Sequence, residues 1–451
     1  MSSSQTFLAI DLGASSGRGI LVTLAEGRVT MEELHRFENF KVQLGDTLHW
    51  NILWLQQQII ECLHRCATRD VELAGIGVDT WGVDFGLLDA DGVLLGNPVC
   101  YRDLRTENIH DYTDPILSQD EIFRLTACDP WPISTLMQLL AMKRDGSAQL
   151  DCARHLLHIP DLFNYFLTGV MANDLSNLTT GNMVGPDCEW ATELFERVGL
   201  PTQLLGGDII APPKRLGVLS ESIQKETGLG AVPVICVAGH DTAAVVAAIP
   251  AEGDNWAFLS CGTWSILGAA RDEPVAAPAC LHAGFTNEYT IGGWYLCHNI
   301  SGLWLINELQ RHWGRDDASW DYVRMTAEAR EAESGGLIDV SDASLTAPEN
   351  MEQALYAVMD KHSQPRPATR GQLVRAVLES LAMEYARRLE TLGELTGDRY
   401  DRLYMVGGGI ANTLLCEFTA LACGLPVHAG ANECTAMGNA LGQAMAVGTV
   451  G

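Results

Sequence analysis

The sequence predicts an α/β protein of two similar domains with a cleft between them. Strand-like apolar runs alternate with helical stretches, which is typical of an α/β layout. Two short loops rich in Gly, Ser or Thr, at residues 11–18 and 260–265, each follow such a run early in their half of the chain. The matching positions favour a duplicated fold, and ligands of two-domain proteins bind preferentially between the domains.

The first half begins with strands and one helix. Apolar runs bounded by Gly or Asp predict strands, while apolar residues at helical spacing predict a helix over 52–66. Residues 134–167 are mostly helical in pattern and residues 176–199 are rich in turn residues. The predicted strands are 7–10, 19–24, 73–78, 85–88 and 232–237.

The second half repeats the opening pattern. We place the domain boundary near residues 250–254, which gives an N-terminal domain of residues 1–250 and a C-terminal domain of residues 251–451. A strand at 256–260 leads into the second loop, and the polar, Pro-rich residues 331–370 predict a surface excursion. Helices are predicted at 243–249, 371–392 and 412–423, and a strand at 403–406.

Composition excludes several classes of partner. The chain has 57 acidic and 29 basic residues, a formal net charge of −28, so it would repel nucleic acid and anionic membranes. The acidity fits adaptation to high salt or an ordinary acidic cytosolic enzyme. The first six residues lack the basic region of a signal peptide, and no apolar stretch reaches membrane-spanning length. The thirteen cysteines are scattered without metal-type spacing, which favours a reduced, cytoplasmic protein.

The two loops have the composition of phosphate-binding turns. Glycine permits close approach of the backbone to an anion, and hydroxyls and Arg18 supply donors in the first loop. Asp11, at the mouth of that loop, is best explained by a metal ion carried with the phosphates. A plain hairpin is the alternative for either loop alone. No G-x-x-x-x-G-K-[ST] sequence occurs, and the first loop joins two strands, so neither a P-loop nor a dinucleotide site is predicted.

Asp241 is the candidate general base. It follows a buried strand at the edge where open α/β sheets present functional groups, and a carboxylate there could take a proton from a hydroxyl that attacks a phosphate. Capping of the next helix is the alternative role. Trp81 could stack on a sugar or belong to the core, and Arg102 and Arg105 could bind hydroxyls or lie in solvent.

These motifs together resemble the FGGY carbohydrate kinases, whose fold is that of two actin-like (ribonuclease H-like) ATPase domains with an interdomain active site. The resemblance covers nearly the whole chain and is closest to members that act on L-rhamnulose. Five ordered motifs carry it: residues 78–85, 239–243, 259–265, 299–305, and 406–409 with Asn412.

The resemblance implies transfer of the γ-phosphate of ATP, with Mg²⁺, to the 1-hydroxyl of L-rhamnulose, with Asp241 as catalytic base. Asp11 would approach the metal. A small ketose and ATP would be the only partners, the protein would be cytoplasmic, and it would be a monomer or homodimer. The residues implied at the sugar are Gly82, His240, Asp241, Thr242 and Asn299, and those at the nucleotide are Ala14, Ser15, Ser16, Gly17, Arg18, Thr263, Asn307 and Gly408.

Several residues depart from the pattern of the L-rhamnulose members. Leu104 stands where Ser is usual, Tyr289 where Gly is usual, and Gly181 where Gln is expected, whereas Gln138, in place of the wider family's Lys, is a change those members share. The departures leave the phosphate chemistry intact and bear on the sugar. Two alternatives therefore stay open: a kinase for another ketose, such as L-fuculose, L-xylulose or another pentulose, and a non-catalytic actin-like ATP-binding module, which would lack the base that Asp241 supplies.

Overall fold

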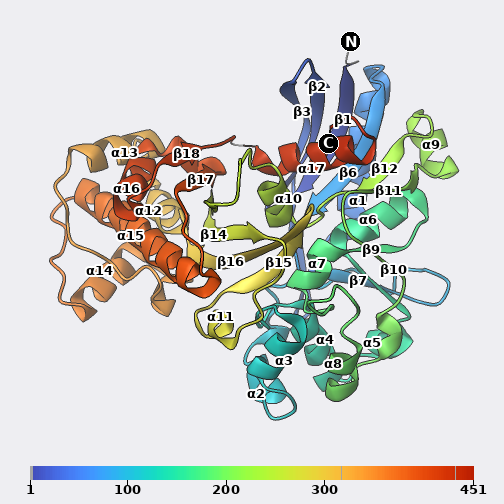
Figure 1. Cartoon of the computed structure of the whole chain (residues 1–451), viewed down its shortest axis with the longest axis horizontal. Helices are drawn as coiled ribbons and strands as arrows, with labels where there is room; N and C mark the ends of the chain where they lie inside the picture. Colours follow the sequence, from blue (N-terminus) through green and yellow to red (C-terminus); the bar gives the residue numbers. More distant parts are fainter. Residues whose placement is uncertain (1–3, 316, 432, 451) are drawn as a thin grey trace.

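The protein contains two six-stranded mixed sheets, one in each half of the chain (Figure 1). The structure, a computed structural model, describes residues 4–315, 317–431 and 433–450. The prediction that the first six residues are not part of a signal peptide rests partly on residues 1–3, which lie outside the described residues. The first sheet has the order β11-β12-β6-β1-β2-β3. Its strands are β1 Gln5–Leu12, β2 Ser16–Ala25, β3 Arg28–Glu38, β6 Leu73–Thr80, β11 Lys214–Val218 and β12 Pro233–Cys236.

The second sheet repeats the arrangement. Its order is β15-β16-β14-β13-β17-β18, with strands β13 Trp256–Cys261, β14 Trp264–Arg271, β15 Thr286–Thr290, β16 Gly293–Ser301, β17 Arg402–Val406 and β18 Val427–Ala429. In both sheets the first strand pairs antiparallel with the second and parallel with a later strand (β1 with β6, β13 with β17). The predicted α/β class and duplication are confirmed.

Helices cover the first sheet, and a largely helical region is inserted between β6 and β12. The side chain of Asn51 accepts a hydrogen bond from the Trp54 backbone N–H and so caps α1, whose apolar stripe is buried. The helices are α1 Ile52–Thr68, α2 Ile109–Thr113, α3 Gln119–Thr126, α4 Thr135–Arg144, α5 Ala148–Cys152, α6 Ile159–Thr168, α7 Leu175–Thr180, α8 Thr192–Val198, α9 Glu221–Thr227 and α10 Asp241–Ala247. Short strands form three further pairs: β4 Lys41–Leu44 with β5 Thr47–Trp50, β7 Phe85–Leu88 with β8 His155–His158, and β9 Ala172–Asp174 with β10 Asp208–Ile210.

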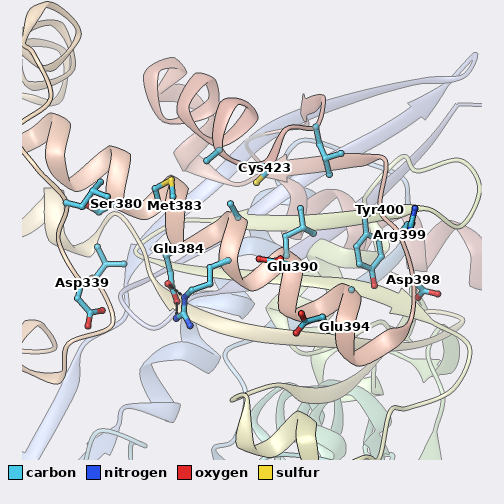
Figure 2. Close-up of a pocket in the computed structure, with 18 of the residues that line it drawn as sticks. Asp339, Ser380, Met383, Glu384, Glu390, Glu394, Asp398, Arg399, Tyr400 and Cys423 are labelled. Carbon is cyan, nitrogen blue, oxygen red and sulfur yellow. Dashed lines mark hydrogen bonds and ion pairs between the residues drawn. The ribbon is translucent and has the colours of Figure 1, made fainter.

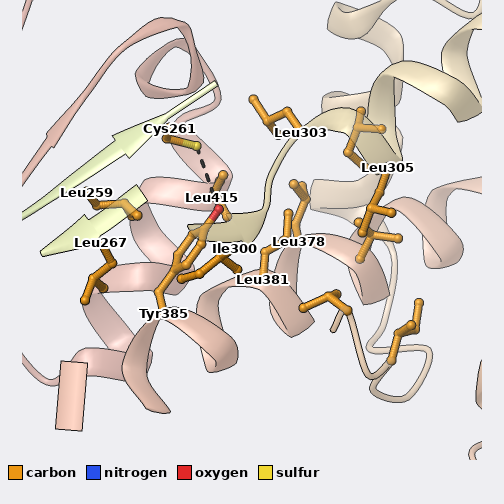
Figure 3. Packing of buried hydrophobic residues seen from close by; sticks show 14 of the residues in the cluster. Leu259, Cys261, Leu267, Ile300, Leu303, Leu305, Leu378, Leu381, Tyr385 and Leu415 are labelled. Atoms are coloured by element: carbon orange, nitrogen blue, oxygen red, sulfur yellow. Dashed lines mark hydrogen bonds between the residues drawn. The ribbon is translucent and has the colours of Figure 1, made fainter. Parts of the chain in front are cut away.

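The core of the second half forms between its sheet and the long helix α15. Figure 3 shows apolar side chains from β13, β14 and α15 meeting around Tyr385. The phenol of Tyr385 is fully buried, and its hydroxyl shares a 2.7 Å hydrogen bond with Ser265 Oγ, so its polar atom is satisfied. The helices of this half are α11 Pro278–His282, α12 Trp304–Gly314, α13 Tyr322–Glu331, α14 Met351–Lys361, α15 Arg370–Thr396, α16 Thr413–Cys423 and α17 Cys434–Ala446. None of the helices in the described ranges is long and apolar enough to cross a membrane.

Two sequence predictions were wrong in part. Residues 176–199, predicted to be turn-rich, include α7 and α8, and α7 forms because the Asp174 side chain caps it by accepting from the Ser176 N–H. The predicted surface excursion at 331–370 contains α14, whose Leu355 and Met359 are fully buried in the second core. Polar composition concealed an apolar helix face in both segments.

The last helix, α17, leaves the second half and packs on the first sheet (Figure 1). Its small residues Ala436, Ala440 and Ala444 pack against Phe7, Ala9, Ile20 and Val22. Asn439 Nδ2 donates to the Gly77 carbonyl at 3.2 Å, and Gln443 Nε2 donates to the Leu8 carbonyl at 3.1 Å. The domain boundary near residue 250 stays a proposal, because a helix from the second half completes the packing of the first.

The contact between α17 and α10 depends on Gly438. A Cβ atom at this position would lie 1.8 Å from the Ala244 backbone oxygen, so the helices could not keep their spacing. We expect Gly438→Ala to lower the free energy of unfolding by about 1–3 kcal/mol, although alanine is the better helix former. The midpoint of thermal unfolding measures this. Gly314→Ala is the control, since its Cβ would meet nothing within 4 Å. An equal effect of the two substitutions would contradict the packing argument.

Candidate active site

The first predicted loop is the hairpin between β1 and β2. The Gly13 N–H donates to the Ser16 carbonyl at 2.9 Å, and Ala14 and Ser15 form the tip. Lys41 Nζ donates to the Ala14 carbonyl at 2.9 Å and Asn39 Nδ2 to the Gly13 carbonyl at 2.8 Å. The tip is therefore fixed by two side chains that follow β3.

Gly17 has a packing role. A Cβ atom there would lie 2.3 Å from the ring of Phe37 on β3, so glycine is needed for the strands to pair. We predicted that glycines of this loop permit close approach to an anion, and at Gly17 the neighbouring aromatic ring is a further reason for glycine.

Arg18 joins the two halves of the chain. It stands opposite Asp11 in the antiparallel register, and its Nη2 lies 2.5 Å from Asp11 Oδ2. Its Nη1 contacts the carboxylate of Glu433, which precedes α17. Burial raises the pKa of Asp11, against the opposite effect of the Arg18 charge.

Two further carboxyl groups, those of Asp79 and Asp241, lie near Asp11. Asp79 stands beside it in the parallel register of β1 and β6, is fully buried, and accepts a 2.5 Å hydrogen bond from Asn439 Nδ2. Asp79 Oδ1 has no hydrogen-bond partner among the described residues. Burial, and then the charge of Asp11, raises the pKa of Asp79 well above its usual value, with a smaller contribution from Asp241. Sequence reasoning did not identify Asp79 as part of this cluster, because its neighbour on β1 is distant in the chain.

The loop that carries Asp241 is held by backbone contacts. The Thr80 N–H donates to the Gly239 carbonyl at 2.8 Å, which ties the end of β6 to this loop. The Gly239 N–H donates to Asp174 Oδ2 at 3.0 Å, and the His240 N–H donates to Ser176 Oγ at 3.1 Å. The loop is thus fixed on both sides before the helix starts.

Asp241 is the most accessible carboxylate of the cluster. Its side chain is 37% exposed, compared with 6% for Asp11. Asp241 is the first residue of α10, and the cap residue His240 makes no side-chain capping bond, so an Asp241 carboxylate that accepts an N–H at the start of the helix agrees with the alternative role. Asp241 Oδ1 accepts from the Thr242 backbone N–H at 2.6 Å, which leaves its other oxygen available to a ligand. Thr242 is itself buried.

His240 lies between two carboxylates. Its Nε2 is 3.4 Å from Asp241 Oδ1, and its Nδ1 is 3.0 Å from Oε2 of Glu288 on β15. Burial lowers the pKa of His240, but Glu288, followed by Asp241, outweighs burial and raises that pKa to about 9. His240 is therefore an imidazolium at neutral pH. Gly82 lies against it, because a Cβ atom there would be 3.1 Å from the imidazole Nε2. Sequence reasoning gave Glu288 no role.

The residues after Gly82 form a buried polar network. Asp84 Oδ2 accepts from the indoles of Trp50 at 2.5 Å and Trp81 at 3.0 Å, and Gln138 Nε2 donates to Asp84 Oδ1 at 2.9 Å. Burial raises the pKa of Asp84 to about 6. Trp81 is 5% exposed with its ring 3.9 Å from that of Trp50, so it belongs to the core and the stacking role is wrong.

The second predicted loop is the hairpin between β13 and β14. The Trp304 N–H donates to the Thr263 carbonyl at 3.0 Å, so α12 begins on this turn, and Asn307 lies one turn further along that helix. Asn307 Oδ1 accepts from Tyr322 at 3.0 Å. Asn299 lies on the neighbouring strand β16, and no hydrogen bond or ion pair within the described ranges joins it to His240.

The glycines after β17 lie against the second hairpin. A Cβ atom at Gly409 would be 2.3 Å from Cys261 Sγ, so this position requires close packing. A Cβ atom at Gly408 would meet nothing within 4 Å, so its face is open to a ligand.

A separate groove runs along α15, with a volume of about 1140 Å³ (Figure 2). It is lined by Asp339, Glu384, Glu390, Glu394 and Asp398, among others, and by the apolar stem of Met383. None of the residues predicted at the nucleotide, sugar or metal lines it. The groove is therefore distinct from the candidate active site.

Comparison with known proteins identifies the family to which this chain belongs. Residues 6–247 match the N-terminal domain, and residues 257–447 the C-terminal domain, of the FGGY family of carbohydrate kinases. The chain is 40% identical to a rhamnulokinase of Bacteroides thetaiotaomicron over 98% of this chain and 91% of that protein. It is 35% identical to a rhamnulokinase of Pectobacterium carotovorum over 99% and 89%.

Solved structures share the fold. A xylulose kinase from Rhodospirillum rubrum superposes with a TM-score of 0.80 at 18% identity, covering 98% of this chain and 90% of that one. A Plasmodium falciparum glycerol kinase with ADP gives 0.79 at 15% identity, covering 100% and 91%. The predicted actin-like two-domain fold is confirmed, and the chain belongs to the FGGY family of carbohydrate kinases, enzymes that transfer a phosphate group to a sugar.

Proposed function

We propose that this kinase phosphorylates L-rhamnulose at the 1-hydroxyl with ATP, and that Asp241 is the general base. The observation that carries the base assignment is the exposed Asp241 carboxylate beside the His240 imidazolium, at the end of a buried strand. The sugar assignment is supported by near-full-length similarity to several proteins named rhamnulokinase. We expect a cytoplasmic monomer or homodimer.

The proposed reaction needs a single proton transfer. The Asp241 carboxylate accepts the proton of the 1-hydroxyl while that oxygen bonds to the γ-phosphorus of ATP. The bond from phosphorus to the bridging oxygen breaks, and its electron pair leaves with ADP. The hydrogen bond from Thr242 holds one carboxylate oxygen, so the other is oriented toward the sugar. Gly82, His240, Thr242 and Asn299 are proposed to bind that sugar.

The nucleotide is proposed to lie between the two hairpins. Backbone N–H groups of Ala14, Ser15, Ser16 and Gly17, with the Arg18 guanidinium, would contact phosphates from one side. Thr263 would contact them from the other side. The open face of Gly408 suits a flat group such as the adenosine moiety, and Asn307 on α12 would contact the nucleotide.

The carboxyl cluster fits Mg²⁺. Magnesium is usually bound by one or two carboxylates together with water and substrate phosphates, so it needs no dedicated cage of side chains. Asp11 is the proposed contact, and the unpartnered Asp79 Oδ1 on the adjacent strand is a second buried oxygen of the kind that suits a cation. When bound, the ion would neutralise charge on the phosphates.

A panel of sugars tests the substrate. With Mg-ATP and coupled detection of ADP, we expect the highest kcat/KM with L-rhamnulose among L-rhamnulose, L-fuculose, L-xylulose, L-ribulose, D-xylulose and glycerol. A preference for another ketose would keep the kinase and overturn the sugar assignment.

Asp241→Asn tests the base. The amide keeps the size and the hydrogen bond from Thr242 but cannot accept the proton, so we expect kcat to fall by about 10²–10⁴. Sugar and ATP should still bind, as isothermal titration would show. Asp254→Asn, at an exposed position, is the control. Turnover close to that of the unmodified protein would exclude Asp241 as the base.

Arg18→Ala tests the nucleotide site. Loss of the guanidinium removes a phosphate donor and leaves Asp11 without its partner, so KM for ATP should rise about tenfold or more, and KM for the sugar much less. Arg28→Ala, at an exposed position of β3, is the control. A larger rise in KM for the sugar than in KM for ATP would contradict the assignment of Arg18 to the nucleotide site.

A further inference from the structure

The partner of His240 comes from the other half of the chain. His240 ends the loop after β12, and Glu288 lies on β15, the edge strand of the second sheet. Their side chains are 12% and 8% exposed, and His240 Nδ1 lies 3.0 Å from Glu288 Oε2. The atoms are not aligned for an ideal hydrogen bond, so the attraction is mainly between the two charges.

Glu288 is itself held by a further donor. The hydroxyl of the fully buried Tyr295 on β16 donates to Glu288 Oε2. Burial raises the pKa of Glu288, but the His240 charge, with the hydrogen bond from Tyr295, outweighs burial and brings the pKa below its usual value. Glu288 is therefore a carboxylate at neutral pH, and it is fixed in position before any ligand binds.

The strand that carries Glu288 is bonded to the first half along its length. The Asp129 N–H donates to Thr286 Oγ1 at 3.0 Å, and Asn287 Nδ2 donates to the Ala127 carbonyl at 2.6 Å. The Tyr289 N–H donates to Thr179 Oγ1 at 3.0 Å, and Thr290 Oγ1 donates to the Ala243 carbonyl at 2.6 Å. Every residue of β15 on either side of Glu288 thus has a contact across the boundary. The ion pair therefore lies within a hydrogen-bonded junction between the two halves of the chain.

We propose that Glu288 is a positioning residue that directs the His240 ring so that its Nε2–H points past Gly82 into the sugar site. The proposal rests on the proposed function only in naming the sugar as the acceptor. With Nδ1 toward Glu288, the Nε2 nitrogen is the one beside Asp241 and Gly82. A doubly protonated ring donates at both nitrogens, so it would bind an oxygen acceptor of the ketose next to the base.

The pKa of His240 distinguishes the proposed role of Glu288 from a purely structural one, because a structural role alone would leave this pKa unchanged when the Glu288 charge is removed. The groups that face His240 are Glu288, Asp241 and Asp174, which raise its pKa, and His158, which burial keeps neutral with a pKa of about 3. Because the pKa of His240 lies above its ordinary value, the imidazolium persists up to about pH 9 and is lost above it.

Glu288→Gln tests this directly. The amide has the same shape without the charge, so burial should dominate and the pKa of His240 should fall by about 1–3 units. Nitrogen-15 NMR of histidine-labelled protein as a function of pH measures it, with His240 assigned by His240→Asn. Glu331→Gln, at an exposed position, is the control. Glu288→Asp, which restores the charge, should recover part of the shift. A His240 that titrates as before in Glu288→Gln would overturn the proposal.

Steady-state kinetics on the same variants tests the link to the sugar. We expect kcat/KM for the ketose to fall about 10- to 100-fold in Glu288→Gln, since a charge-assisted hydrogen bond is misdirected, with KM for ATP within about twofold. Tyr295→Phe keeps the Glu288 charge and should have a smaller effect. A changed His240 pKa with unchanged sugar kinetics would overturn the sugar-directing role.

Failure of the proposal and failure of the proposed function are distinguishable. The NMR measurement needs no substrate, so it decides the Glu288–His240 pairing even if L-rhamnulose is not the sugar. In that case the kinetic comparison uses whichever ketose of the panel is phosphorylated, and the same two outcomes apply.

Discussion

The candidate active site depends on carboxyl groups held close together, two of which, Asp11 and Asp79, are buried. Burial raises the pKa values of Asp11 and Asp79, and the neighbouring carboxyl groups raise them further. Like charges at short range in a low-dielectric environment cannot all remain ionised without compensation. Arg18 supplies a positive charge beside Asp11, Asn439 supplies a hydrogen bond to Asp79, and His240 supplies a positive charge beside Asp241.

Each compensating group ties the two halves together. Arg18 in the first half also contacts Glu433 in the second, Asn439 comes from α17, and His240 is paired with Glu288 on β15. The electrostatics of the site therefore require both halves, which are joined by the contacts of α17 and β15.

The sequence was sufficient to predict those parts of the site whose residues are adjacent in the chain, and insufficient for contacts between distant residues. The hairpins of Asp11–Arg18 and of Thr263, and the strand that presents Asp241, were predictable because turn residues and apolar runs are adjacent in the chain. The partners Asp79–Asn439 and His240–Glu288 were not, because 360 residues separate the first pair and the second crosses between sheets. Trp81 shows a second limit: an indole beside polar residues has the composition of a sugar-binding site, and only packing against Trp50 places it in the core.

The residues that depart from the L-rhamnulose pattern differ in how strongly they contact their surroundings. Leu104 is 76% exposed, so its side chain constrains little around it. At Gly181 a Cβ atom would lie 2.6 Å from Thr135 Oγ1 and 3.0 Å from His158 Nε2, so a glutamine would displace the 3.0 Å hydrogen bond between those two side chains. Thr135 Oγ1 also donates to the Val83 carbonyl at 2.7 Å, and Val83, with φ of 68°, follows Gly82 in a strained turn. A change at residue 181 is thus transmitted through Thr135 to the turn that places Gly82 against His240. Gly181 is therefore a departure with a direct structural route to the proposed sugar site.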